Sequence, residues 1–588
     1  MNGKPLIRPW LLCGFFFFVT SGYAQPKGKA QKGPDKIGSP QTIEAKLDNI
    51  FSSFTNTTPG IAVTVLKHGK VIAKKAYGLA SLEHQALFTH KTVVRLPYSE
   101  GREFMAIAAA MMEQQGLLNL QDKVRKFFPQ LPAWSEPVTV YDLMNHRSGF
   151  VDEWATLLLA QASMTNRFDK SQFLDLLYRQ PKPEVEPGKG YMYSNSDFGL
   201  LRLILEKASG QNLRHWMKGN IFDPLNMKAT LLHDDKDEVI PAFSPTYYPF
   251  GKGYKTWTFD KTSPGGNYYI ATTANDLQKW AAAHADTNSA IAKAVVKLFK
   301  KPQLMPGKDK DYAFGYKIKP LGNYEVFTHQ GVNHRTYISN AKSGGVTVVL
   351  VSNTMAEYYP YHEQILSYLL GVEKPAFINK LFKKEKVQYS AGELKQFTGI
   401  YIEADTVTYE SFTGKRTEFL ELLIENDSLK MKFGKDIFPL EYIAWGVFRD
   451  MDYPAYLEFS RDKGDSNRLR AHIHGNNKVV ELVKDNYRYQ QPEKEELKTF
   501  AGKYYSPHLD IYWTIVLDNQ NKLMVKRSNI ADTELDPHIN KEFRIRIEKF
   551  PGDSFNSWVK FWVDEERKVT HLTVHDPRLM HHRFDKVQ

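Results

Sequence analysis

Cysteine is nearly absent from this chain of 588 residues, which contains one, Cys13. A single cysteine excludes a disulfide framework and any zinc site built from cysteine ligands. Long apolar runs are also missing, because no stretch of about 18 consecutive apolar residues follows the first 24 residues. These absences argue against a disulfide-stapled scaffold, a cysteine-based zinc protein and a polytopic membrane protein.

The overall composition is that of a globular protein. Hydrophobic residues make up 42% of the chain and charged residues 24%, which excludes a disordered, collagen-like or coiled-coil protein. At roughly 100 to 200 residues per domain, the length corresponds to about three to five domains, enough to bury a large core.

The first 24 residues have the pattern of a secretory signal peptide. Lys4 and Arg8 precede an apolar stretch at residues 10–19, and small residues stand at Gly22 and Ala24. We therefore expect residues 1–24 to be removed and the mature protein to be secreted or periplasmic. A lipoprotein would carry its lipid on Cys13, but Leu12 is not the small residue usual before such a cysteine.

Basic residues outnumber acidic ones, 78 to 66, for a formal net charge of +12. A basic chain raises the possibility of a nucleic-acid partner. Here the lysines are spread along the sequence, apart from a segment after the signal and one near residues 380–386. We interpret them as solvated surface and expect no nucleic-acid partner; association with anionic polymers of the cell envelope stays open, as does the oligomeric state.

Residues 41–372 mix helical and strand patterns. Residues 61–66 and 71–73 are apolar and flank a turn at residues 67–70, which predicts a hairpin. Residues 345–351 form an apolar, β-branched run suited to the centre of a sheet. Strands from both ends with helices between them predict an α/β (α+β) domain closed by its termini. Residues 25–40, rich in Lys, Gly, Pro and Gln, are expected to form a flexible linker.

The C-terminal part contains an internal repeat. After a basic linker at residues 373–390, the segment at residues 393–401 recurs at residues 496–504, so that Leu394 and Leu497 stand 103 positions apart. Each copy continues with strand, turn and strand patterns. The repeat predicts two antiparallel β-barrel modules, at residues 391–489 and 493–588.

Ser99 opens a predicted amphipathic helix. Five apolar residues, Phe104, Ile107, Ala108, Met111 and Met112, follow the spacing of one buried helix face, and Gly116 supplies a stop. A serine at a helix N-terminus can cap the helix, or it can act as a nucleophile whose developing negative charge the helix dipole favours. The stretch alone leaves both interpretations open.

Three further segments complete a recognisable series: residues 143–149 (Leu-Met-Asn-His-Arg-Ser-Gly), the Tyr193-x-Asn195 pair, and residues 328–331 (Thr-His-Gln-Gly). In this order and spacing, residues 41–372 resemble the serine β-lactamase and penicillin-recognising hydrolase superfamily, in the branch that contains class C β-lactamases, D-aminopeptidases, D-Ala-D-Ala carboxypeptidases and esterases. The resemblance implies acyl transfer to water through an acyl-enzyme, on a small-molecule or peptide substrate and without a metal or organic cofactor.

The resemblance also implies site residues. Catalytic roles fall to Ser99 as nucleophile, Tyr193 as the phenol that moves its proton, and the residue three positions after the serine. Substrate-binding roles fall to Asn195, His329, Gly331 and Val332, with the N–H groups of Ser99 and Val332 as the oxyanion hole.

The residue three positions after Ser99 departs from the superfamily pattern, because it is Arg102 where the superfamily carries lysine. A desolvated lysine can lose its proton and act as a base, whereas guanidinium cannot. Arg102 could hold Tyr193 as an anion, leaving an enzyme of the peptidase, esterase or β-lactamase type, impaired or not. It could equally mark a non-catalytic protein that binds peptide or cell-wall fragments.

Histidines in the C-terminal part suggest a third alternative, a metal site. His472 and His474 would share one face of a strand, and four more histidines lie at residues 571–582. No further ligand stands at an established metal-site spacing, so we expect surface histidines and no metal.

Overall fold

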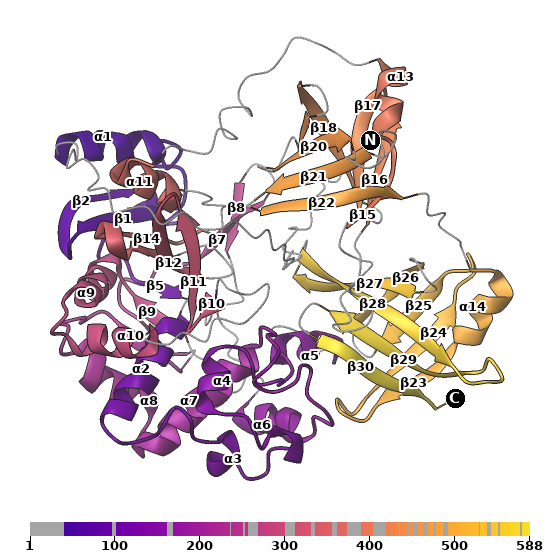
Figure 1. The fold of residues 1–588 in the computed structure, drawn as a ribbon, viewed down its shortest axis with the longest axis horizontal. Coiled ribbons are helices and arrows are strands. Elements are labelled where there is room, and N and C mark those ends of the chain that lie inside the picture. The colour runs from indigo at the N-terminus through magenta and orange to yellow at the C-terminus, as the bar shows by residue number, and fades with distance from the viewer. Residues whose placement is uncertain are drawn as a thin grey trace.

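The computed structural model describes most of the chain after residue 39 (Figure 1). The described residues are 40–96, 101–160, 169–235, 237–250, 253–256, 269–299, 312–330, 336–354, 361–372, 390–403, 419–433, 436–444, 447–450, 455–461, 469–475, 478–485, 492–527, 530–537, 542–550, 553–576 and 579–587. The signal sequence, the linker at residues 25–39 and most of the basic linker therefore lie outside the described part. Within the described residues, no helix is both long and apolar enough to span a membrane.

A seven-stranded antiparallel sheet forms the centre of the N-terminal half. Its order is β10-β11-β12-β13-β14-β1-β2, so strands from the two ends of this half meet in the middle. The predicted hairpin is confirmed: β1 and β2 are joined at His68 and Gly69, both with positive φ. The bounds are β10 Tyr312–Ala313, β11 Tyr316–Leu321, β12 Tyr324–Gln330, β13 Thr336–Ala341, β14 Val346–Ser352, β1 Ile61–Lys67 and β2 Lys70–Tyr77.

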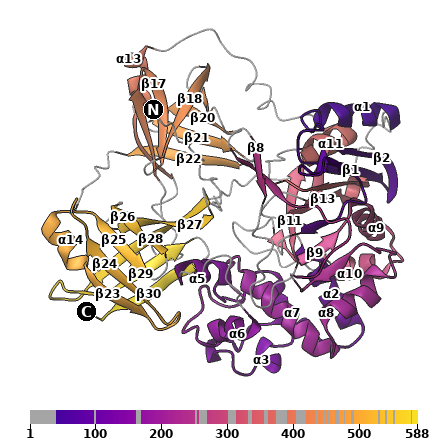
Figure 2. The ribbon, with the colours of Figure 1, turned by 180° about the vertical axis from the view of Figure 1, so that it is seen from behind.

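Side chains alternate across this sheet, and helices cover both of its faces. In β14, Val348 packs with α1 (Pro40–Ile50) and α11 (Tyr361–Leu370), whereas Val349 faces a larger core that includes α2 (Arg102–Gln114), α9 (Ala274–Ala285) and α10 (Ala290–Phe299). Because successive side chains of a strand point to opposite faces of the sheet, an apolar strand such as β14 contributes to the cores on both sides. Figure 2 shows α1 and α11 at one end of this layered arrangement and α2, α9 and α10 beneath the sheet.

The helix predicted after Ser99 is present as α2, and its predicted face at Phe104, Ile107, Ala108, Met111 and Met112 is buried. It runs between the sheet and a second group of helices. That group comprises α3 (Val124–Phe127), α4 (Val140–Met144), α5 (Glu153–Leu159), α6 (Lys170–Tyr178), α7 (Asn195–Ser209) and α8 (Leu213–Met217). Small sheets complete the half: β3 (Leu79–Ser81) with β4 (Ala86–Leu87), β7 (Tyr247–Phe250) with β8 (Gly253–Thr256), and β5 (Val94–Leu96) with β9 (Tyr269–Thr272) and β6 (Leu231–His233).

The repeat corresponds to two closed eight-stranded antiparallel barrels. A short helix precedes each one, α13 (Ala391–Leu394) and α14 (Lys494–Phe500). The first barrel contains β15 (Gly399–Glu403), β16 (Phe419–Glu425), β17 (Ser428–Phe433), β18 (Asp436–Ala444), β19 (Val447–Asp450), β20 (Ala455–Arg461), β21 (Leu469–Gly475) and β22 (Lys478–Asp485). The second contains β23 (Gly502–Ser506), β24 (Ile511–Leu517), β25 (Leu523–Arg527), β26 (Ile530–Pro537), β27 (Glu542–Phe550), β28 (Asp553–Val563), β29 (Val569–Asp576) and β30 (Leu579–Lys586).

The same tyrosine bond recurs in both barrels. Buried Tyr401 donates its hydroxyl to the Phe397 carbonyl over 2.9 Å, and buried Tyr504 donates to the Phe500 carbonyl over 2.7 Å. Each bond ties the preceding helical turn to the first strand of its barrel. The equivalence supports a duplicated module, as the sequence repeat predicts.

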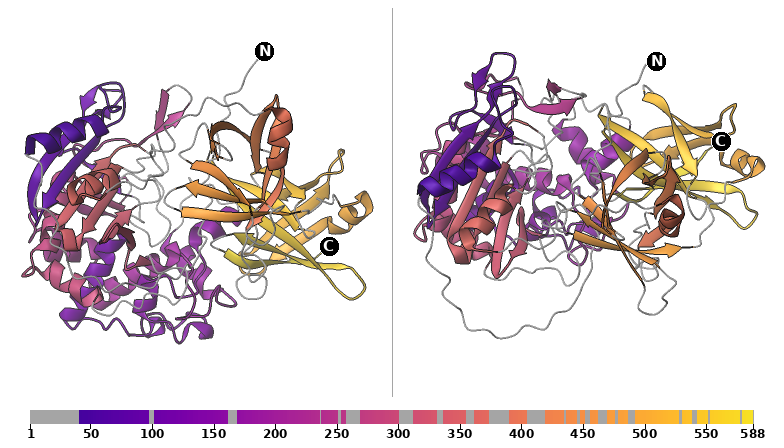
Figure 3. Two further views of the ribbon diagram at one scale, coloured as in Figure 1. Left: turned by 45° about the horizontal axis from the view of Figure 1, so that its top comes forward. Right: turned by 90° about the horizontal axis from the view of Figure 1, so that it is seen from above.

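The second barrel packs on the helices of the N-terminal half. Trp513 donates its indole N–H to the Leu159 carbonyl at the end of α5 over 3.3 Å. His508 Nε2 lies 3.0 Å from the Leu176 carbonyl of α6. Apolar residues of barrel and helices belong to one continuous buried cluster. Figures 1 and 2 both label α5 beside this barrel, and in Figure 3 purple helices also lie beside the yellow barrel.

Candidate active site

The structure describes some of the predicted site residues and not others. Ser99, Gly331 and Val332 lie outside the described residues, and their roles stay predictions. His329 lies in β12, where its main chain pairs with Ile338 of β13. Arg102, Tyr193 and Asn195 are fully described, and they lie together.

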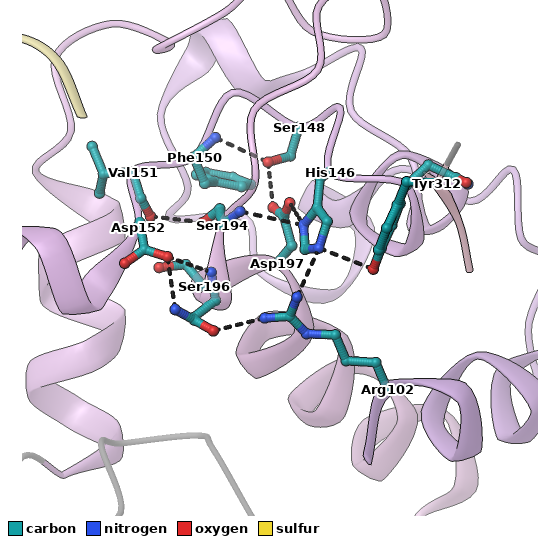
Figure 4. A network of polar contacts seen from close by, with 12 residues as sticks. Arg102, His146, Ser148, Phe150, Val151, Asp152, Ser194, Ser196, Asp197 and Tyr312 are labelled. Atoms are coloured by element: carbon teal, nitrogen blue, oxygen red, sulfur yellow. Dashed lines mark hydrogen bonds and ion pairs between the residues drawn. The ribbon is translucent and has the colours of Figure 1, made fainter. Parts of the chain in front are cut away.

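Arg102 is the first residue of α2 and is 2% exposed. Gly101 stands at the N-cap without a side-chain cap, so the helix begins three residues after Ser99. Residues 102–112 of this helix are buried. The Arg102 side chain extends from α2 toward α7 and the loop after α4 (Figure 4).

The Arg102 guanidinium lies between two residues of the predicted Tyr193-x-Asn195 motif. Nη2 donates to Asn195 Oδ1 over 2.7 Å, and the guanidinium carbon lies 4.3 Å from the centroid of the Tyr193 ring. It also lies 4.9 Å from the centroid of the Phe198 ring. Burial and these internal contacts make Arg102 part of the site's framework. They do not favour a role in gripping a carboxylate of a bound molecule.

Asn195 connects Arg102 to a buried carboxylate at the start of α5. Its main-chain N–H and its Nδ2 each donate to Asp152 Oδ2 over 2.8 Å. The other oxygen, Asp152 Oδ1, accepts from the Ala155 N–H and caps α5. One of the two Asn195 amide hydrogens is therefore engaged by the protein itself. Its predicted role as a donor to the substrate rests on the second hydrogen and stays a prediction.

His146 and Asp197 form a buried pair next to Arg102. His146 Nδ1 lies 3.0 Å from Asp197 Oδ2, and both side chains are fully buried. Ser148 also donates its hydroxyl to Asp197. Burial raises the pKa of Asp197 well above its ordinary value, and Ser148 and Arg102 partly counter this effect. Asp197 belongs to the first turn of α7, where the helix dipole favours a carboxylate.

The other ring nitrogen of His146 meets two partners. Nε2 lies 3.0 Å from Arg102 Nη1 and 3.1 Å from the Tyr312 hydroxyl of β10. Figure 4 shows Arg102 and Tyr312 reaching this nitrogen from α2 and from the sheet edge. Burial is the main cause that raises the pKa of Tyr312, while Arg102 acts to lower it. The ring centroid of His146 lies 4.7 Å from that of Tyr193.

Two more buried carboxyls lie close to this group. Glu103 follows Arg102 and accepts the Trp280 indole N–H over 2.7 Å, and burial raises the pKa of Glu103 to about 8. Glu153 is fully buried, and within the described part of the chain neither of its oxygens has a hydrogen-bonding partner. Burial, then the charge of Asp152, raises the pKa of Glu153 well above its ordinary value. Burial therefore favours the protonated form of both carboxyls.

Four residues of this group were not predicted as site residues: His146, Asp152, Asp197 and Tyr312. His146 stands in the predicted segment at residues 143–149, which gave no role to its imidazole. Its positive φ of 54° places it in a tight turn after α4. Asp197 stands two residues after Asn195, so the start of α7 supplies both the amide that contacts Arg102 and the carboxyl that contacts His146. Tyr312 comes from a distant strand, and nothing local in the sequence indicates its contact with His146.

The metal alternative finds no support among the described residues, which contain no group of three His, Cys, Asp or Glu side chains able to hold an ion. The expectation of surface histidines is wrong for His575 and His582, each 4% exposed. They lie 2.9 Å from the hydroxyls of Thr573 and Ser506. The barrel interior satisfies these rings with hydroxyl groups, which explains why they can be buried.

The chain is similar in sequence to several known proteins. The sequence model of the family described as Beta-lactamase matches residues 43–366. A D-aminopeptidase of Cereibacter sphaeroides is 27% identical over 349 residues, which cover 57% of this chain and 64% of the relative. Penicillin-binding protein 4* of Bacillus subtilis is 24% identical over 391 residues, covering 61% of this chain and 83% of the relative.

A solved structure also shares the fold. The octameric penicillin-binding protein homologue from Pyrococcus abyssi superposes with a TM-score of 0.51 at 19% identity, over 76% of this chain and 99% of that chain. The residues that match the family model, 43–366, begin within α1 and end within α11, and they contain every residue of the network around Arg102. The chain therefore belongs to the Beta-lactamase family, whose sequence model covers more than half of it.

Proposed function

We propose that this protein is an exported serine hydrolase that cleaves an amide or ester through an acyl-enzyme on Ser99. The observation that carries the proposal is the placement of Arg102. From the start of α2 it contacts both the Tyr193 ring and Asn195, and the superfamily's lysine is expected at this position. These contacts of a fixed cation with the Tyr193-x-Asn195 motif support the proposal.

The proposed reaction has two acyl-transfer steps. The Ser99 oxygen attacks the substrate carbonyl while its proton leaves, and the tetrahedral intermediate collapses as the leaving amine or alcohol takes up a proton. Water then attacks the acyl-serine and releases the acid. Arg102 supplies charge that stabilises a phenolate or an oxyanion, but it cannot accept a proton.

An amide of a D-amino acid is the substrate class we favour. The support is the similarity to proteins named D-aminopeptidase. Because the chain spans less than two thirds of the length of these relatives, this substrate class is part of the proposal. Export would bring such an enzyme to peptides or wall fragments in the envelope, and the signal pattern of residues 1–24 supports that location.

Hydrolysis of three chromogenic substrates by the full chain tests this proposal. A D-amino-acid anilide, a simple ester and nitrocefin should be compared for wild type, Ser99→Ala and the control Ser53→Ala, which alters an exposed serine. We expect turnover of the anilide or the ester, its loss in Ser99→Ala, and its retention in Ser53→Ala. Turnover unchanged in Ser99→Ala, or no turnover of any of the three, would contradict the proposal.

The non-catalytic alternative makes the opposite prediction for Arg102→Lys. A hydrolase limited by a guanidinium should gain rate from the lysine amine. A binding protein that grips its ligand through Arg102 should lose affinity and gain no turnover. The burial of Arg102 and its bonds to His146 and Asn195 favour the hydrolase.

A further inference from the structure

The proton on His146 can be assigned from its neighbours. A guanidinium has only N–H donors, so His146 Nε2, 3.0 Å from Arg102 Nη1, must be the acceptor of that bond. The neutral ring therefore carries its hydrogen on Nδ1, which donates to Asp197 Oδ2 over 3.0 Å. The main-chain N–H of Ser194 also lies 3.3 Å from Nδ1, and this contact opposes the assignment, because an Nδ1 that carries hydrogen has no lone pair to accept it. The two shorter contacts of the ring, each 3.0 Å, favour the Nδ1–H tautomer.

The same lone pair on Nε2 faces a phenol. Tyr312 lies 3.1 Å away through its hydroxyl, and its side chain is half-buried, whereas His146 is fully buried. Asp197, His146 and Tyr312 thus form a chain from a buried carboxylate through an imidazole to a hydroxyl. This order of groups is the one that lets an imidazole take a proton from a hydroxyl and a carboxylate stabilise the resulting cation.

The charged and titratable groups around His146 come from several elements. The positive charge of Arg102 in α2 disfavours protonation of the His146 ring, and a negative charge on Asp197 in α7 favours it. Asp152 lies on the far side of Asn195, and Asp142 of α4 also acts on Asp197. The phenols that face the ring are Tyr191, Tyr193 and Tyr312, with centroid separations of 6.0, 4.7 and 5.0 Å.

We infer that His146, held by Asp197, is the proton-holding residue of this site, and that it exchanges the proton through the Tyr312 hydroxyl in place of the missing lysine. Tyr312 then takes the proton-moving role that the superfamily resemblance implies for Tyr193, because the Tyr312 hydroxyl lies 3.1 Å from His146 Nε2. The inference rests on the proposed function for its role in turnover. His146 is a positioning residue in this account, because it acts through Tyr312 and does not touch the substrate.

The proton balance of the step is simple. The O–H bond of the attacking alcohol breaks, its proton passes to the Tyr312 oxygen, and the phenol's own proton forms a bond with His146 Nε2. Tyr312 ends neutral, His146 becomes an imidazolium paired with the Asp197 carboxylate, and the alcohol oxygen bonds to the carbonyl carbon. The proton returns by the same path to the leaving group when the intermediate collapses.

Protonation of Nε2 and the Arg102 bond exclude each other. Once Nε2 carries a hydrogen it can no longer accept from Nη1, and it donates to the Tyr312 oxygen instead. Arg102 keeps its bond from Nη2 to Asn195. The geometry thus couples proton uptake by His146 to the release of one Arg102 hydrogen, which a lysine at the same position would not require.

The tautomer of His146 tests the inference without turnover. In the full chain labelled with ¹⁵N-histidine, long-range ¹H–¹⁵N correlations should show an Nδ1–H ring that becomes protonated reversibly as the pH falls. His146→Gln assigns the signals by their loss. If that variant fails to fold, the signals perturbed in Tyr312→Phe assign them. An Nε2–H tautomer, or a ring that stays neutral down to the pH of unfolding, would overturn the inference.

Kinetics then test the role in turnover. We expect Tyr312→Phe to lower kcat/KM by about 10²-fold. In wild type, the acid limb of the pH profile of kcat/KM should coincide with the titration of His146. Tyr368→Phe, which alters an exposed tyrosine of α11, is the control. A rate within twofold of wild type for Tyr312→Phe would overturn the inference, while loss of turnover in Ser99→Ala would still support the hydrolase.

Rescue separates a proton-holding role from a structural one. Arg102→Lys supplies a titratable amine, so the double variant Arg102→Lys with His146→Gln should be at least about tenfold more active than His146→Gln alone. A purely structural role for His146 predicts no rescue. If wild type has no turnover, the proposed function fails, and the tautomer measurement alone decides whether His146 holds the proton as assigned.

Discussion

Arg102 donates from Nη2 to Asn195 Oδ1 over 2.7 Å, and Asn195 in turn donates to Asp152 over 2.8 Å. The amide therefore links the cation of α2 to the carboxylate that caps α5. Three elements far apart in the sequence are fixed by one side chain. This link places a permanent charge where the superfamily has a titratable one, and the proposed chemistry depends on it.

Removal of the Asn195 amide should destabilise the protein. Asn195→Ala leaves the buried groups of Arg102 and Asp152 short of partners, and we expect the free energy of unfolding to fall by about 2–3 kcal/mol. Denaturant unfolding followed by tryptophan fluorescence measures this. Asn288→Ala, at an exposed position, should change it by less than about 0.5 kcal/mol. Equal effects of the two substitutions would contradict the linking role.

Glu103 should make stability fall as the pH rises. Its pKa is raised from 4.5 to about 8 in the folded protein, chiefly by burial, so between these pH values the folded state holds a proton that the unfolded state has lost. Stability is then greatest below pH 4.5 for this group and decreases toward pH 8. We expect Glu103→Gln to flatten the fall in Tm between pH 5 and about 8. A fall as steep as in wild type would contradict the assignment.

His582 should make stability fall as the pH decreases in the acid range. Burial lowers the pKa of its ring from 6.5 to about 3, so the unfolded state binds a proton over a range in which the folded state does not. Stability from this group is complete above pH 6.5 and decreases as the pH falls toward 3. His582→Gln, which keeps a donor for Ser506, should reduce the acid loss of Tm. His84→Gln, at an exposed position, should leave it unchanged.

The bond between Trp513 and Leu159 should couple the second barrel to the helices. Trp513→Phe keeps an aromatic ring but removes the N–H donor, and we expect it to cost about 1 kcal/mol. Trp513→Ala also opens a cavity at the interface and should cost about 3–5 kcal/mol. Calorimetry should then show the barrel unfolding separately. Trp562→Phe, whose N–H bond lies within the barrel, should not separate the transitions.

Local patterns predicted the parts of the fold that depend on nearby residues. The hairpin at His68 and Gly69, the buried face of α2 and the repeat that gives Tyr401 and Tyr504 equivalent bonds were all visible in short segments. Periodicity and repetition act over a few residues, and the sequence carries them directly. The confirmed superfamily resemblance likewise rests on short motifs with a fixed order.

The contacts around His146 could not be predicted in the same way. Its bond to Asp197 joins positions 51 residues apart, and its bond to Tyr312 joins positions 166 residues apart. Only the folded arrangement of α4, α7 and β10 brings them together. The burial of His582 escaped prediction for a similar reason, because the hydroxyl of Ser506 that satisfies its ring comes from the opposite end of the barrel sequence.

Covalent labelling of Ser99 tests the central claim most directly. The full chain should be treated with a fluorophosphonate probe and with a penicillin, and its intact mass and peptide map compared with those of Ser99→Ala. The account predicts one adduct on the peptide that contains Ser99 and none in the variant. An unchanged mass at saturating probe, or an adduct that persists in Ser99→Ala, would contradict it.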